Sequence, residues 1–159
     1  PRSEDEELVC IAENKSCSVD AVQYLLGCTA GKGNLIVIDN GKQAFTFYSR
    51  DQGKAMRIYF KGDVFAGMDA MRQRMASGDL TPAEKKEMEA MRSRIMEQIL
   101  TGRDEDLLDV KEEEIPAPDK ARIYPSLVCQ ECGERFMEIM GRTANGKVLC
   151  KDCFARLIC

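Results

Sequence analysis

The sequence predicts an α+β protein in which an antiparallel sheet packs with helices, followed by a small four-cysteine zinc ribbon at the C-terminus. Three observations predict this class. Apolar segments of strand length dominate up to about residue 60, apolar side chains then recur at helical spacing to about residue 100, and two C-x-x-C pairs follow. The 159 residues, 44% of them hydrophobic, suffice for one domain of about 100 residues and a smaller module that needs help to fold.

Four segments have the length and composition of β-strands. They are residues 8–12, 35–38, 44–48 and 56–60. The Asn40-Gly41 turn predicts a hairpin between the second and the third of these, and a turn at residues 51–53 leads into the fourth. We therefore expect the last three strands to form an antiparallel meander, with Phe45 and Phe47 on one face.

Three stretches have the apolar period of helices. Residues 18–27 run from a capping serine to a glycine that suits a left-handed C-terminal cap. A second helix is expected within residues 63–78. The third begins with the capping box at Thr81 and runs to about Leu100.

The sequence between the last helix and the C-terminal cysteines is acidic and contains prolines. Leu107–Val110 can add an edge strand before the linker begins. We therefore assign residues 1–110 to the α+β core, residues 111–124 to an acidic, proline-containing linker, and residues 125–159 to the zinc ribbon.

The C-terminal cysteines have the spacing of a metal site. Cys129 and Cys132 form one C-x-x-C pair, and Cys150 and Cys153 form the second after seventeen intervening residues. Each pair can direct two sulfurs at one ion, and Gly133 gives the first turn the backbone freedom that it needs. We expect one zinc ion per chain. The site is predicted to be structural, because four thiolates leave no open position on the metal.

Several alternatives exist for these cysteines. Asn145-Gly146, at the centre of the intervening segment, favours a hairpin that brings the two pairs together on one ion. The pairs could instead form two disulfides, or a redox-active dithiol, which would need a thioredoxin-like βαβ context. Cys159 is left over as a spare thiol. A unit of about 35 residues buries little apolar surface, so zinc would supply much of its folding free energy.

A second candidate site, for a core metal or another ligand, surrounds the first predicted helix. Cys17 stands at its N-terminal entrance, where a thiol has a lowered pKa, and Cys28 lies just past its C-terminal end. The glycine-rich loop that follows carries Lys32, which could hold an anionic ligand, although the loop lacks the spacing of a P-loop. The alternative is that both cysteines are small buried hydrophobes, which is our expectation for Cys10.

Composition narrows the function classes. The chain has no histidine, which excludes an imidazole base or ligand from this sequence. The formal net charge of −4 makes nucleic acid an unexpected partner, and no apolar run approaches the roughly 20 residues of a membrane span. The acidic N-terminus lacks the order of a signal peptide, so we expect a cytoplasmic protein. Methionine-lined helices and an exposed sheet edge predict a homodimer.

Two runs of the N-terminal half are distinctive. They are Cys17-Ser18-Val19-Asp20-Ala21-Val22-Gln23, and Gly27-Cys28-Thr29-Ala30-Gly31-Lys32-Gly33-Asn34-Leu35. Together with the Gly41–Phe47 stretch they resemble the FmdE family, named after formylmethanofuran dehydrogenase, over residues 1–110. The C-terminal ribbon is similar to DksA/TraR-type zinc fingers. The family's N-terminal H-x-H-x-C-x-G segment has no counterpart, and because the chain starts with proline rather than methionine we expect it to begin inside a longer sequence.

The resemblance implies an α+β core with a metal-binding cleft, often dimeric, and a molybdenum or tungsten oxidoreductase as partner. It carries Cys17 and Cys28 over as residues of a core site that could hold a second metal. We predict a zinc-binding accessory or regulatory protein without turnover of its own. The alternatives are a small enzyme that uses a Cys17 thiolate, completed by residues upstream of this chain, and a ribbon that docks nucleic acid or protein.

Overall fold

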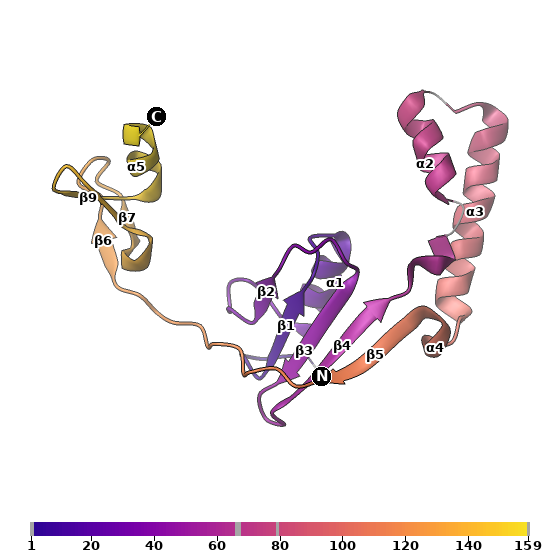
Figure 1. The fold of residues 1–159 in the computed structure, drawn as a ribbon, viewed down its shortest axis with the longest axis horizontal. Coiled ribbons are helices and arrows are strands. Elements are labelled where there is room, and N and C mark those ends of the chain that lie inside the picture. Colours follow the sequence, from indigo (N-terminus) through magenta and orange to yellow (C-terminus); the bar gives the residue numbers. More distant parts are fainter. Residues whose placement is uncertain (1, 66–67, 79, 159) are drawn as a thin grey trace. The chain divides into compact units, whose positions relative to one another are not determined.

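The computed structural model describes residues 2–65, 68–78 and 80–158. These fall into two compact units, one up to Lys120 and the other from Ala121 (Figure 1). The first unit combines helices with a sheet in which three of the four strand pairings are antiparallel. The predicted α+β class is therefore confirmed.

The first unit is built on a five-stranded sheet. Its strands are β1 (Leu8–Ala12), β2 (Leu35–Val37), β3 (Ala44–Ser49), β4 (Lys54–Phe60) and β5 (Leu108–Glu113), in the order β2-β1-β3-β4-β5. Helix α1 (Cys17–Leu26) connects β1 to β2, and this crossover allows the two strands to run parallel. The other neighbouring strands of this sheet are antiparallel.

The predicted hairpin between residues 35–38 and 44–48 is wrong. β1 lies between β2 and β3 and pairs with both, so the two strands flanking the Asn40-Gly41 turn never meet. The loop instead packs on the end of β1, where the N–H groups of Asn40 and Lys42 both donate to the carbonyl oxygen of Glu13 at 3.1 Å. A local turn signal cannot reveal that a buried strand from earlier in the chain takes the intervening place. The hairpin between β3 and β4 is confirmed.

Each face of the sheet has its own apolar layer. Val9, Tyr48 and Ala55 are cross-strand neighbours and form a buried cluster against which Ile36 and Ile115 pack. The opposite face carries the phenylalanine pair of β3 expected from the alternation, with ring centroids 6.3 Å apart. Residues from well beyond the helices, at 115, thus complete the core of the sheet.

A helical hairpin separates β4 from β5. It consists of the 3-10 helix η1 (Gly62–Phe65), α2 (Met68–Ser77) and α3 (Pro82–Thr101), and a short helix α4 (Asp104–Leu107) leads back to the sheet. The capping box predicted at Thr81 is present, with Glu84 as its reciprocal partner. Helix α4 was not predicted, and the last three residues of β5 lie in the segment predicted as linker. No described helix is long and apolar enough to cross a membrane.

The second unit consists of two small hairpins and a terminal helix. Its elements are β6 (Ser126–Val128), β7 (Arg135–Met137), η2 (Glu138–Met140), β8 (Arg142–Ala144), β9 (Lys147–Leu149) and α5 (Lys151–Ile158). The predicted turn at Asn145-Gly146 joins β8 to β9, and both residues have positive φ, 50° and 74°. Helix α5 was not predicted from the sequence.

Candidate metal centre

The first C-x-x-C pair lies in a tight turn between β6 and β7. The carbonyl oxygen of Cys129 accepts the N–H of Gly133 at 2.9 Å, and the N–H of Cys129 donates to the carbonyl of Glu134 at 2.9 Å. Gly133 has φ 76°, a left-handed conformation that glycine adopts without steric cost. The turn therefore folds the chain back on itself so that both sulfurs of the pair point to the same side.

The second pair lies where β9 passes into α5. Leu149, the last residue of β9, is fully buried with Cys129 and Cys153, and these three form the core of the unit. Cys150 precedes the helix, and Cys153 lies in its first turn. A strand end and a helix start thus fix the second pair, in the same way as a strand end and a glycine turn fix the first.

The four sulfurs predicted as ligands come together in the structure. All lie within 4.8 Å of one another, and the sulfurs of Cys132 and Cys150 are 3.9 Å apart. Four thiolates at a Zn–S distance of about 2.3 Å would stand about 3.8 Å apart in a regular tetrahedron. The donor set and its spacing therefore fit a tetrahedral zinc ion, and the completed set would leave the ion no position for substrate.

Hydrogen bonds from the protein favour the thiolate form at two of these sulfurs. The N–H of Cys150 donates to the sulfur of Cys129 at 3.3 Å, and the guanidinium of Arg156 donates to the sulfur of Cys153 at 2.9 Å. Backbone N–H groups, that of Cys132 foremost, lower the pKa of the Cys129 thiol to about 6. Metal ligation requires deprotonated sulfur, so these donors prepare the site for a cation.

The residues predicted for a core site are not brought together. Cys17 is exposed at the start of α1, whereas Cys28 is buried just beyond its end. Ten helical residues span about 15 Å, which separates the two cysteines by more than one ion can bridge. Among the residues the structure describes, the four cysteines of the second unit are the only group of three or more candidate metal ligands.

Cys28 and Cys10 share a buried environment. Both are fully buried, and the Cys28 thiol contacts the carbonyl oxygen of Leu8 at 3.5 Å. Burial raises the pKa of the Cys10 thiol to about 12 and also raises that of Cys28. Both cysteines are therefore neutral thiols at physiological pH, which agrees with the interpretation of Cys10 as a core residue and favours the same role for Cys28.

Lys32 holds the N-terminal segment. Its ammonium donates to the carbonyl oxygens of Ser3 at 2.9 Å and Glu4 at 3.4 Å. The same segment is fixed by Asn34, a fully buried side chain that donates to the carbonyl oxygens of Leu8 at 2.9 Å and Asp5 at 3.1 Å. This role of Asn34 was not predicted, because an asparagine at the end of a glycine-rich loop is usually part of a turn.

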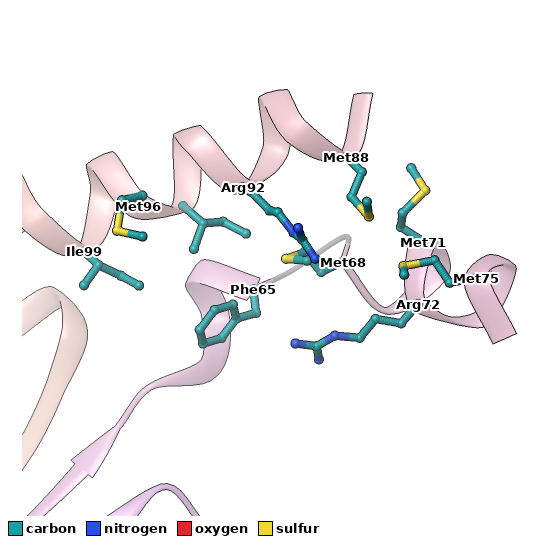
Figure 2. Close-up of a pocket in the computed structure, with 10 residues that line it drawn as sticks. Phe65, Met68, Met71, Arg72, Met75, Met88, Arg92, Met96 and Ile99 are labelled. Atoms are coloured by element: carbon teal, nitrogen blue, oxygen red, sulfur yellow. The ribbon is translucent and has the colours of Figure 1, made fainter. Parts of the chain in front are cut away.

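A groove lies between the helices of the hairpin. It has a volume of about 550 Å³, and five of its lining residues are methionines (Met68, Met71, Met75, Met88 and Met96). The side chains of Arg72 and Arg92 extend into the space between α2 and α3 (Figure 2). Ile95 of α3 is buried, but the adjacent Met96 remains 59% exposed, so much of the apolar surface of α3 is uncovered.

Comparisons with known proteins match both units. Residues 1–109 match the family described as "FmdE, Molybdenum formylmethanofuran dehydrogenase operon", and residues 122–157 match the "Prokaryotic dksA/traR C4-type zinc finger". The second match covers all four clustered cysteines.

Two individual proteins are similar over nearly the whole chain. A protein of Archaeoglobus fulgidus named "Probable S-adenosyl-L-methionine-binding protein" is 30% identical over 93% of this chain, which spans only 41% of that relative's length. The crystal structure of an FmdE-like protein of tungsten formylmethanofuran dehydrogenase from Syntrophus aciditrophicus has a TM-score of 0.63 at 22% identity, over 96% of this chain and 74% of that one. The structural likeness supports the fold.

Proposed function

The chain belongs to the FmdE family, and we propose that it is a zinc-binding accessory or regulatory protein of molybdenum or tungsten formylmethanofuran dehydrogenase-type metabolism. The observation that carries the proposal is the four-cysteine cluster joined to an FmdE core. Such a cluster would stabilise a folded surface rather than bind substrate, because its coordination is closed. The metabolic context comes from the family, and the partner we propose is an oxidoreductase of that type.

The geometry of the first unit favours a role without turnover. Cys17 is exposed, but Cys28 is buried at the other end of α1 and Lys32 is engaged by two backbone carbonyls. A nucleophile needs a base within hydrogen-bond reach, and the predicted candidates do not provide one to Cys17. We therefore place the zinc-dependent unit, rather than the α1 region, at the centre of the proposed function.

Metal analysis of two matched variants tests the proposal. Purified wild-type chain should contain one zinc per chain, Cys129→Ser should lose it, and Cys17→Ser should retain it. Loss of metal with Cys17→Ser would instead support the alternative, a small enzyme with a metal site in the core. Absence of zinc from the wild-type protein purified under reducing conditions would overturn the proposed metal centre.

A pull-down tests the proposed partner. The oxidoreductase subunits should be retained by the wild-type chain and lost with Cys129→Ser if the zinc-dependent unit docks them. Retention by both proteins would move the docking surface to the first unit. Retention by neither would remove the accessory role while leaving the zinc assignment intact.

We further propose that two copies associate through the helical hairpin. The methionine groove of α2 and α3 is uncovered, and a second hollow on α3 shares Arg92 and Met96 with it and is rimmed by Glu97. In a symmetric antiparallel pairing, Arg92 of one copy can approach Glu97 of the other, so the surface is complementary to itself. Light scattering should give a dimer that Met96→Glu dissociates, while Glu97→Arg should weaken it and Arg92→Glu combined with Glu97→Arg should restore it. A wild-type monomer at high concentration would contradict this.

A further inference from the structure

The four cysteines of the metal centre do not have equivalent surroundings. Cys129 and Cys153 are 1% and 2% exposed, whereas Cys150 is half-buried and Cys132 is exposed. A hollow of about 390 Å³ lies beside the cluster, and its lining includes Cys132, Cys153 and Arg156. Solvent and small reagents therefore reach the cluster from the side that these residues share.

Arg156 stands at this opening. It lies three residues after Cys153 on α5, a spacing that places two side chains on the same face of a helix, and its guanidinium donates to the Cys153 sulfur at 2.9 Å. A zinc ion with four thiolates carries a net charge of −2, and a guanidinium at this distance offsets part of it. The arginine also covers the one buried sulfur that borders the hollow.

Cys132 has a different neighbour. Its sulfur lies 3.9 Å from the carboxylate of Glu134, and Glu131 also lines the hollow. A nearby anion raises the electron density that a thiolate can offer to an electrophile, whereas a hydrogen bond donated by a cation lowers it. The two sulfurs that border the opening thus differ in both exposure and charge.

We propose that Arg156 is a positioning residue of the metal centre that shields the Cys153 thiolate, so that soft electrophiles react first at Cys132. The inference rests on the proposed zinc site but assigns a residue outside the four ligands. A charge-assisted hydrogen bond lowers the basicity of a thiolate, and nucleophilicity falls with basicity, so loss of the arginine should raise the reaction rate of Cys153 about three- to tenfold.

Alkylation of the zinc-loaded full chain with excess N-ethylmaleimide tests the order of reaction. The sulfur forms a bond to one alkene carbon, and the displaced electron pair takes a proton from water. The rate at each cysteine is read from its own fragment by mass spectrometry, so cysteines outside the cluster do not interfere. Cys132 should react first in the wild type. Reaction at Cys150 or Cys153 before Cys132 would overturn the proposal.

Three variants separate the arginine's contact from its charge. Arg156→Ala should accelerate Cys153 selectively, Arg156→Lys should restore much of the protection, and Lys151→Ala, which removes the same charge from the same helix, should leave the order unchanged. Equal acceleration with Lys151→Ala, or no change at Cys153 in Arg156→Ala, would overturn the proposed contact.

Cobalt substitution distinguishes shielding from loss of structure. In Arg156→Ala the tetrahedral cobalt bands should persist while the sulfur-to-cobalt charge-transfer band shifts, because the coordination remains and the sulfur becomes a better donor. Collapse of the tetrahedral bands with equal acceleration of all four cysteines would show that Arg156 merely stabilises the fold, and the proposal would fail. The zinc content of Cys129→Ser, which tests the metal site itself, is independent of these results.

Discussion

The two units of the chain are stabilised by different means. Among the described residues, the second unit has three buried hydrophobic side chains, Leu149 and two cysteines. The first unit buries a cross-strand apolar cluster and several polar side chains, of which Asn34 is fully enclosed. A unit of fewer than about 40 residues rarely folds on apolar burial alone. The comparison indicates that folding of the second unit depends on the metal and that folding of the first does not.

Metal removal should have the largest effect and would break this comparison most directly. Apparent zinc-binding free energies of small fingers are about 10–16 kcal/mol at pH 7, so a chelator should unfold the second unit. Hydrogen exchange of the full chain should then show lost protection in β6 to α5 and unchanged protection in β1, β3 and β4. Readdition of zinc, but not of magnesium, should restore it. Equal loss in both units would mean that the sheet also depends on metal.

Asn34→Ala should have the next largest effect, confined to the first unit. The side-chain oxygen accepts the N–H of Thr29 at 2.8 Å while the amide donates to two or more carbonyls, so its loss leaves buried polar groups unpaired. We expect a cost of about 3 kcal/mol in the free energy of unfolding. Urea denaturation measures this cost, and zinc content should stay unchanged. Asn40→Ala, at an exposed position, is the control and should change the free energy by less than about 1 kcal/mol.

Gly27→Ala should destabilise the first unit by about 2 kcal/mol. The residue has φ 72°, and an added Cβ would stand 2.6 Å from the carbonyl oxygen of Ser3. Gly53 also has a positive φ, 62°, but an added Cβ there would meet no atom within 4 Å. Gly53→Ala should therefore show only the backbone strain, about 1 kcal/mol. Thermal unfolding compares the two variants, and equal losses would exclude close packing at Gly27.

Acid should weaken the first unit by a smaller amount through one ion pair. Arg57 donates to the Glu13 carboxylate at 2.6 Å, and this bond holds the pKa of Glu13 below its ordinary value of 4.5. Because the folded-state pKa is lowered, the stabilisation is present at neutral pH and is lost as the pH falls below about 4.5.

The variant Glu13→Gln should remove about 1 kcal/mol at pH 7 and flatten the acid dependence. Urea denaturation between pH 7 and 3.5, followed by a probe in the first unit, measures both effects. Asp39→Asn, which breaks an exposed pair with Lys15, serves as control and should change little. An unchanged pH profile in Glu13→Gln would assign the acid sensitivity to other groups.

Local sequence signals predicted most of the elements but not their neighbours. The capping box at Thr81, the Asn145-Gly146 turn and the strand alternation around Phe45 each depend on a few adjacent residues, and each is present in the structure. The pairing of β1 between β2 and β3 depends on burial of a strand that is distant in sequence, so the Asn40-Gly41 signal was misleading. The helix α5 was missed because the metal site attracted the interpretation of its cysteines.

Motifs and spacings of nearby residues were sufficient to identify the family, the strand and helix segments and the four cysteines that form the cluster. How the remaining polar groups are used became visible only in the folded chain. Folding separates Cys17 from Cys28, engages Lys32 with backbone carbonyls, and places Arg156 on the Cys153 sulfur. The physical reason is that exposure, hydrogen-bond partners and charge at a side chain are set by segments that the folded chain brings close, and spacing along the sequence does not record them.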